Sequence, residues 1–212
     1  MTIEDFGARV ASVWQGLRPS TRNLVERALT TTTTAPQTAA AANVSRTDAA
    51  YDARSEWELS RLLGALDERA DEKNGARLSD EQSRDLLRVA ETCASVLQRQ
   101  ARSAEVFSQL LARAVRAKDY VRVDALADVM SARLVPSELS EMARDPNPSV
   151  RAVAQEALLQ LPTSTLVSLL GDPVDADTAR SALEAQAVEY DSEEARIIVH
   201  ALEQVEEDEE DF

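Results

Sequence analysis

The chain is poor in the residues that build metal and redox sites, with one cysteine, Cys93, and one histidine, His200, among its 212 residues. A lone cysteine cannot form an internal disulfide, which is typical of a reducing compartment, and a zinc site would need more nitrogen and sulfur ligands. The five glycines are isolated from one another, so the sequence has no glycine-rich phosphate loop. We therefore expect no metal, no cofactor and no nucleotide hydrolysis.

Aromatic residues are also scarce, at 4%, and the chain contains only five glycines and seven prolines. Alanine, leucine, arginine and glutamate are abundant, a composition that favours helices over sheets. A hydrophobic content of 44% is sufficient for a folded core. The sequence thus predicts an all-α fold.

Long apolar runs are absent as well, and none approaches the roughly 18 residues that a membrane span requires. The first six residues, MTIEDF, include acidic residues where a secretory signal has basic ones. We expect a cytoplasmic protein without membrane contact. The 21 arginines against two lysines, Lys73 and Lys118, indicate a bacterial genome rich in G and C.

The net charge of −15 is confined to the C-terminal third of the chain. Residues 136–212 contain 4 basic and 19 acidic residues, whereas residues 1–47 have a net charge of +2 and residues 48–135 a net charge of −2. Contacts with phosphates need lysine and arginine, so duplex nucleic acid is excluded as a partner and an anionic membrane would be repelled. Such a field attracts a protein with a basic surface. A purely solubilising role is the alternative.

Residues 1–29 predict an N-terminal helical hairpin. Its first helix, Thr2 to Leu17, has a narrow apolar seam with spacings of three and four, formed by Ile3, Phe6, Val10, Val13 and Leu17. This seam either packs on another helix of the chain or forms a homodimer. A low-complexity linker follows over residues 30–46, because five consecutive threonines and a run of alanines have little to bury.

A long antiparallel helical pair is predicted for residues 48–101. Its first helix ends near Asn74 and Gly75, and Ser79 with Gln82 forms a capping box at the start of the second. Over residues 103–205 the apolar spacing predicts successive hairpins whose helices are too short to be stable alone. Stacking would give these hairpins one continuous core, as in an α-solenoid.

The segment from Asp145 to Leu161, DPNPSVRAVAQEALLQL, combines a turn, a helix start and an apolar stripe. This pattern resembles a HEAT-like helical repeat, including the short type of phycobilin lyase-like proteins. The resemblance covers residues 137–161 well and residues 103–205 more loosely, and it depends on Asp145, Pro148, Val150, Arg151, Ala154, Ala157 and Leu158. It implies a short HEAT-like α-solenoid of stacked helical hairpins, a fold that usually binds other proteins.

The resemblance also implies structural roles for particular side chains. In the family, the aspartate closes the turn between helices, and the arginine of the second helix pairs with such acids in a ladder along the stack. The next unit departs from the pattern, because Asp175 stands where the first unit has a proline, and its arginine is displaced by two residues. The implied turn and ladder residues are Asp145, Pro148, Arg151, Asp172 and Arg180.

Few residues are candidates for chemistry. Asp48, Asp52 and Glu56 share one helical face, where a pair of acids in a pocket could act as general acid and base. A solvated charged face is the alternative. Cys93 lies on an apolar stripe, which predicts a buried, inert thiol, and His200 adjoins the core face of the last helix, where a pH-sensitive contact is one option. We expect no catalytic residues and no enzymatic activity.

The last ten residues include seven acids and end in a phenylalanine. We expect residues 206–212 to form a disordered acidic tail. Its layout is similar to the acidic, Phe-ended tips through which bacterial single-stranded-DNA-binding proteins recruit partners, although the Ile-Pro of those tips is absent. Partner docking is one interpretation and solubilisation is the other; docking would involve Glu207, Asp208, Glu209, Glu210, Asp211 and Phe212.

These features predict a non-enzymatic scaffold or adaptor that binds a partner with a basic surface. Binding would use the helical-repeat surface and the acidic C-terminal region. The alternatives are a lyase-like or small-molecule-binding chaperone that uses the solenoid groove, and a structural, self-assembling subunit. An apolar pocket lined by Trp57 or Tyr190 would favour the small-molecule alternative, and a flat acidic face would favour the scaffold.

Overall fold

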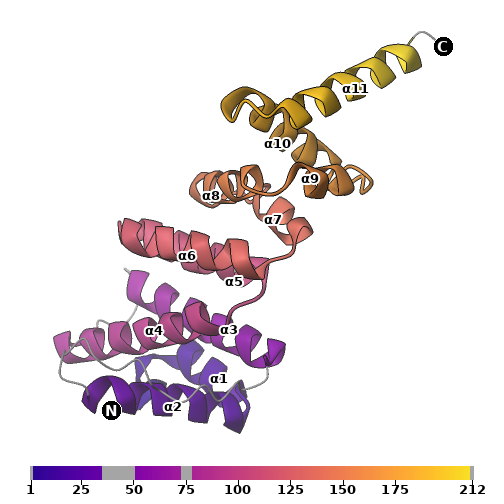
Figure 1. The fold of residues 1–212 in the computed structure, drawn as a ribbon. Helices are drawn as coiled ribbons and strands as arrows, with labels where there is room; N and C mark the ends of the chain where they lie inside the picture. Colours follow the sequence, from indigo (N-terminus) through magenta and orange to yellow (C-terminus); the bar gives the residue numbers. More distant parts are fainter. Residues whose placement is uncertain (1, 35–50, 73–77, 211–212) are drawn as a thin grey trace. The chain divides into compact units, whose positions relative to one another are not determined.

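The computed structural model describes residues 2–34, 51–72 and 78–210, with side chains placed over residues 2–31, 51–72 and 78–204. Within these ranges the chain forms one short 3-10 helix, eleven α-helices and no strand, which confirms the all-α prediction. The chain divides into two compact units, Met1–Ala101 (unit 1) and Arg102–Phe212 (unit 2) (Figure 1).

Unit 1 is a packed group of helices. Helices α3 and α4 form an antiparallel pair, α1 packs on α3, and α2 packs on both members of the pair. The elements of this unit are η1 (Ile3–Phe6), α1 (Ala8–Gly16), α2 (Pro19–Thr34), α3 (Ala53–Asp71) and α4 (Asp80–Gln100).

The first predicted helix, Thr2 to Leu17, is divided at Gly7, so that prediction is wrong in detail. Gly7 has a φ of 131°, a backbone conformation that residues with a Cβ rarely adopt, and it separates η1 from α1. Arg69 on α3 donates from Nε to the carbonyl oxygen of Phe6 at 2.7 Å. This bond satisfies a carbonyl group next to the break in the helix.

The predicted apolar seam is used inside unit 1. Phe6, Val10 and Leu17 are buried, and so is Trp14, which the spacing left outside the seam. Helix α1 packs on α3, and η1 packs on α4. The seam therefore packs largely on other helices of the same chain, and the homodimer through the N-terminal helix stays a prediction.

The predicted linker over residues 30–46 begins too early, because α2 continues to Thr34. Thr30 and Thr31 each donate from Oγ1 to the carbonyl oxygen of Arg27, at 2.8 and 2.9 Å. Such bonds satisfy the hydroxyl groups of β-branched residues within a helix. Residues 35–46 lie outside the described residues.

The starts of α3 and α4 are set by side-chain caps. Asp52 caps α3, since its Oδ1 accepts a hydrogen bond from the backbone nitrogen of Arg54 at 3.1 Å. At α4 the predicted capping box is confirmed: the nitrogen of Gln82 donates to Ser79 Oγ at 3.1 Å, and the nitrogen of Ser79 donates to Gln82 Oε1 at 2.9 Å. These bonds satisfy donors that a helix start leaves unpaired.

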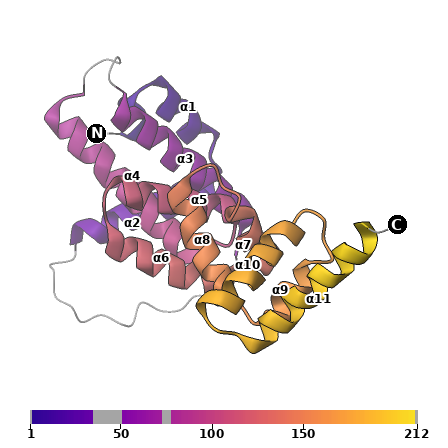
Figure 2. The same cartoon turned by 90° about the horizontal axis from the view of Figure 1, so that it is seen from above.

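Unit 2 is a stack of helical hairpins, as the sequence predicted. The hairpins are α5–α6, α7–α8 and α9–α10; α5, α7 and α9 follow one another in one layer, and α6, α8 and α10 in the other (Figure 1 and Figure 2). The helices are α5 (Ala104–Arg116), α6 (Tyr120–Arg133), α7 (Pro136–Met142), α8 (Pro148–Leu159), α9 (Thr163–Leu169), α10 (Ala176–Glu189) and α11 (Glu193–Glu210).

The core of unit 2 runs continuously between the two layers. Its side chains come from both helices of each hairpin, so that every hairpin completes the apolar surface of its neighbour. The fully or nearly buried members include Phe107, Leu110, Leu111, Leu126, Met130, Leu139, Met142, Val150, Leu158, Leu166 and Leu183.

Helix α11 extends further than the sequence indicated. It packs on α10 and continues to Glu210, so residues 206–210 of the predicted disordered tail are helical. Glutamate is a good helix former, and a helix whose first turns are held by packing propagates at little further cost. Asp211 and Phe212 lie outside the described residues.

Candidate functional site

The implied turn residues of the first repeat lie together at the α7–α8 turn. Asp145 accepts at Oδ1 from the backbone nitrogen of Asn147 at 2.7 Å, and Pro148 is the first residue of α8. Arg151 donates from Nη1 to the carbonyl oxygens of Asp145 and Pro146, at 2.8 and 3.0 Å. The arginine therefore binds the backbone of its own turn rather than the carboxylate of a neighbouring repeat.

The link between the second and third hairpins comes from residues that sequence reasoning did not assign. Arg144, after α7, donates from Nη1 to Asp175 Oδ1 at 3.1 Å, and Asp175 is buried before α10. The same nitrogen also lies within hydrogen-bond distance of Ser140 Oγ and Thr178 Oγ1. The signal for this pair was visible, since Asp175 replaces the proline of the first repeat.

The other two implied ladder residues have different roles. Asp172 closes the α9–α10 turn, where its Oδ1 accepts from the backbone nitrogen of Val174 at 2.9 Å. Arg180 is half-buried on α10. The structure thus places Asp145 and Asp172 in turns and Arg151 on α8 with its side chain bound to the turn, while Arg144 and Asp175 join successive hairpins.

A groove of about 430 Å³ lies between α8 and α10 in unit 2. Its floor is apolar and built from small residues and leucines, with Leu158 and Ala182 buried and Leu159 and Ala185 half-buried. None of its described lining residues is aromatic. They are Ala143, Arg144, Gln155, Leu158, Leu159, Asp177, Thr178, Ser181, Ala182, Ala185 and Glu189.

The mouth of this groove is acidic. Asp177 and Glu189 are exposed among its lining residues, while the one cation there, Arg144, is paired with buried Asp175. Beside the groove, Tyr190 donates its hydroxyl hydrogen to Glu156 Oε1 at 3.0 Å, and this bond raises the pKa of the tyrosine. An apolar floor with an acidic rim suits an amphipathic segment with basic flanks.

Buried Gln186 on α10 fixes one end of the groove. Its Nε2 donates to the carbonyl oxygens of Leu159 and Leu161 at 2.9 and 2.8 Å, and its Oε1 accepts from Thr163 Oγ1 at 3.2 Å. The amide thereby ties the end of α8 and the start of α9 to α10. Sequence reasoning missed this residue, because glutamine on a helix is ordinarily exposed.

The acidic residues of unit 1 are not arranged as the predicted face of Asp48, Asp52 and Glu56. Asp48 lies outside the described residues, Asp52 caps α3, and Glu56 is buried. Glu58, which the prediction did not include, is a second buried carboxylate: it lies between α2 and α3 with its side chain 4% exposed. Instead of a solvated acidic stripe, the chain has a polar network that extends from buried Glu58 to exposed Asp52.

Arg18 connects this network, which also contains Thr21, Asp52, Ser55 and Glu58. Its Nη2 donates to Asp52 Oδ2 at 2.7 Å and to Ser55 Oγ at 3.0 Å, while its Nε donates to Glu58 Oε1 at 3.1 Å. The hydroxyl of Thr21 donates to Glu58 Oε2. Throughout the described chain, every buried side-chain nitrogen and oxygen atom has a partner. Because its carboxylates are compensated in this way, we interpret the network as structural.

The network lowers the pKa values of its two carboxylates. Hydrogen bonds from Ser55 and then Arg18 lower the pKa of Asp52 to about 2. For Glu58, burial alone would raise the pKa, but the bonds from the Thr21 hydroxyl and from Arg18 outweigh it and lower the pKa below its usual value. Both carboxylates are therefore ionised more readily in the folded chain than in the unfolded chain.

We expect unit 1 to lose stability as the pH falls from about 4 toward 2. In the unfolded chain these carboxyls have ordinary pKa values of about 4, so their contribution is complete above that pH and disappears as the pH approaches the folded values. Urea unfolding followed by tryptophan fluorescence at several pH values measures this slope. Asp52→Asn should flatten it, and an unchanged slope in that variant would contradict the assignment.

The remaining candidates for chemistry are located as follows. Cys93 is fully buried on α4, and burial raises the pKa of its thiol to about 12. His200 is exposed on α11, with Nδ1 3.7 Å from Glu203 Oε2. No three potential metal-ligating side chains come together among the residues that the structure describes. Over the same residues, no helix combines the length and apolarity needed to cross a membrane.

No family model, no curated protein and no solved structure matches the chain. The similarity to HEAT-like repeats therefore stays a resemblance in the sequence.

Proposed function

We propose that this protein is a non-enzymatic scaffold or adaptor whose unit 2, a short HEAT-like α-solenoid, binds a basic amphipathic helix of a partner protein in the α8–α10 groove. The observation that carries this proposal is the apolar floor of the groove beneath an acidic rim. The acidic C-terminal region adds long-range attraction, since residues 136–212 have a net charge of −15.

The groove has the dimensions and chemistry for such a partner. Ala182 and Ala185 on α10 leave space opposite Leu158 and Leu159 on α8, so apolar side chains at helical spacing could enter from above. A volume of about 430 Å³ accommodates a few side chains rather than a whole domain. Basic residues flanking those anchors would meet Asp177 and Glu189 at the rim.

The lining argues against the small-molecule alternative. That alternative required an apolar pocket with Trp57 or Tyr190 in its wall, and neither residue lines the groove. Trp57 lies in unit 1, where Arg61 stacks over its ring at 4.6 Å, and Tyr190 is engaged with Glu156. A groove of small, aliphatic and acidic residues favours a protein ligand.

A substitution that fills the groove tests the proposal. The probe is a fluorescein-labelled, leucine- and lysine-containing amphipathic peptide, titrated with the full chain and followed by fluorescence anisotropy at low and high salt. Ala185→Trp places a large ring in the groove, and we expect it to weaken binding at least about tenfold. Salt should also weaken binding to the natural chain, because the rim contributes electrostatically.

The matched control is Ala152→Trp, which makes the same change at an exposed position of α8 outside the groove lining. We expect it to bind the peptide as the natural chain does. Equal binding by the two tryptophan variants, or no binding by the natural chain at low salt, would overturn the groove as the binding site.

A further inference from the structure

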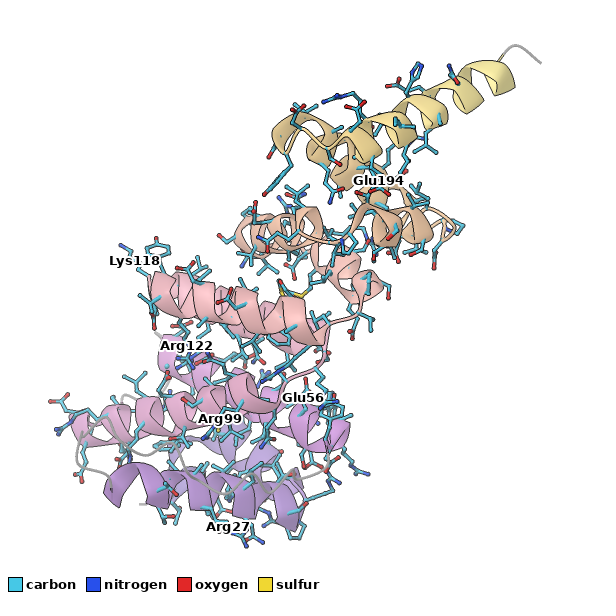
Figure 3. All side chains as sticks on the ribbon, in the orientation of Figure 1. Arg27, Glu56, Arg99, Lys118, Arg122 and Glu194 are labelled. Atoms are coloured by element: carbon cyan, nitrogen blue, oxygen red, sulfur yellow. The ribbon has the colours of Figure 1, made fainter. Side chains whose placement is uncertain are left out.

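The connection between α5 and α6 is a concentrated basic site within an acidic unit. We call Arg113, Arg116, Lys118 and Arg122 the basic tip. Residues 113–122 contain these four cations and one acid, Asp119, whereas the rest of unit 2 contains 6 basic and 22 acidic residues. Figure 3 shows Lys118 at the turn of the hairpin and Arg122 close by.

Three cations of the basic tip, Arg113, Arg116 and Arg122, are close enough to repel one another. Arg113 has a lowered pKa, caused first by its burial and then by the charges of Arg122 and Arg116. Arg122 is also in the first turn of α6, where the helix dipole already presents positive charge. These positions concentrate positive potential at one end of the hairpin, which favours an anionic ligand.

Apolar side chains accompany this charge. Tyr120 and Val121, the first two residues of α6, are 64% and 81% exposed. Lys118 has a φ of 56°, so the chain reverses sharply there and presents the tip at the end of the hairpin. A ligand for this surface would carry a dense negative charge and could also contact the two exposed apolar side chains.

The chain itself contains a segment with that chemistry. Seven acids and no base occur between Glu203 and Asp211, and the helical part of this segment, at the end of α11, reaches Glu210. Helix α11 packs on α10, whereas the basic tip belongs to the first hairpin of unit 2, with α7 to α10 between them (Figure 1). The acidic end of one chain therefore does not lie at its own basic tip.

We propose that the basic tip binds the acidic end of α11 from a second copy of this chain. This proposal rests on the proposed function in one respect: both give the acidic C-terminal region a role in binding. The present proposal names the surface that this region binds. Two different surfaces meet in this contact, so it is heterologous, and repeating it joins chains head to tail. The α8–α10 groove lies outside the contact and stays accessible to a foreign helix.

A complementation experiment tests the head-to-tail contact. The first variant is Lys118→Glu/Arg122→Glu, which retains the acidic end; the second is the chain truncated after Gln204, which retains the basic tip. By sedimentation velocity at low salt, the natural chain should self-associate, and each variant alone should be monomeric. An equimolar mixture should form a 1:1 heterodimer, because each variant supplies the surface that the other lacks. High salt should raise its dissociation constant at least about tenfold.

The controls separate a specific contact from a general charge effect. Arg27→Glu/Arg99→Glu makes the same change in charge at exposed positions of unit 1 and should leave self-association intact. Circular dichroism should show that Lys118→Glu/Arg122→Glu is folded, so that a loss of self-association reports on the contact and not on unfolding.

Two results would overturn the proposal: a natural chain that stays monomeric at low salt, or a mixture of the two variants that does not associate. A peptide titration on the truncated chain tests the α8–α10 groove separately from the head-to-tail contact. If the peptide binds while the mixture stays monomeric, only the head-to-tail contact is lost.

Discussion

Replacement of Glu58 by alanine is expected to lower the free energy of unfolding of unit 1 by about 3 kcal/mol. The Glu58 carboxylate is 4% exposed and accepts hydrogen bonds from Thr21 and from the backbone nitrogen and Nε of Arg18. Its removal leaves the buried Thr21 hydroxyl with fewer partners and places a cavity between α2 and α3. The loss of several charge-assisted bonds at one interior site makes this effect large.

Tryptophan fluorescence is a selective probe for this change, because both tryptophans, Trp14 and Trp57, belong to unit 1. Urea unfolding should show a lower midpoint for Glu58→Ala. The control is Glu68→Ala, which removes an ion pair with Arg9 whose side chains are 54% and 73% exposed, and should cost less than about 1 kcal/mol. Equal shifts in the two variants would show that the interior network contributes no more than a surface pair.

Local sequence patterns were sufficient where the determining interactions are local. The apolar spacing of 3.6 residues identified the helices, and the bonds of the α4 capping box join residues only three positions apart, Ser79 and Gln82. The same reasoning placed Asp145 in the α7–α8 turn. It failed at Gly7, because an apolar seam continues across a glycine without showing that the backbone changes direction.

The interactions that shape the candidate site connect distant parts of the sequence. Arg144 pairs with a residue 31 positions away, and Gln186 bonds to carbonyl groups 25 and 27 positions away. The groove itself exists only because α8 and α10 pack side by side, bringing Ala182 opposite Leu158. A single sequence has no signal for such pairings beyond the unusual residue types involved, such as an aspartate in place of a proline.

The basic tip was missed for a different reason. Over residues 48–135 the net charge is only −2, because acids of other helices offset the four cations of the tip. A window of ten residues would have found it, since residues 113–122 have a net charge of +3. A short window would not show that these residues come from both helices of one hairpin, which only the fold reveals.

Replacement of Gln186 by alanine should lower the free energy of unfolding of unit 2 by about 3 kcal/mol and weaken peptide binding in the groove. Gln186 is 6% exposed, and alanine would leave the carbonyl oxygens of Leu159 and Leu161 without the donor that now satisfies them. The end of α8 would lose its tie to α10, so the floor of the groove would change shape as well as stability.

Far-UV circular dichroism follows the unfolding of all helices, whereas tryptophan fluorescence follows unit 1. We expect Gln186→Ala to lower the unfolding midpoint measured by circular dichroism and to leave the midpoint measured by tryptophan fluorescence unchanged. Gln155→Ala, an exposed change in the groove lining, should alter stability by less than about 0.5 kcal/mol. A stability loss for Gln186→Ala no greater than that of the control would contradict the role of the buried amide.

Gln186→Glu separates the hydrogen bonds from the shape of the side chain. An ionised carboxylate has no donor for the two carbonyl groups and repels them, so the folded state should raise the pKa of this glutamate above its unfolded value of about 4.3. The variant should therefore be least stable, relative to the natural chain, at neutral pH, and should recover part of the deficit as the pH falls and the carboxyl regains one donor. A deficit independent of pH would show that volume, rather than donation to the end of α8, is what Gln186 supplies.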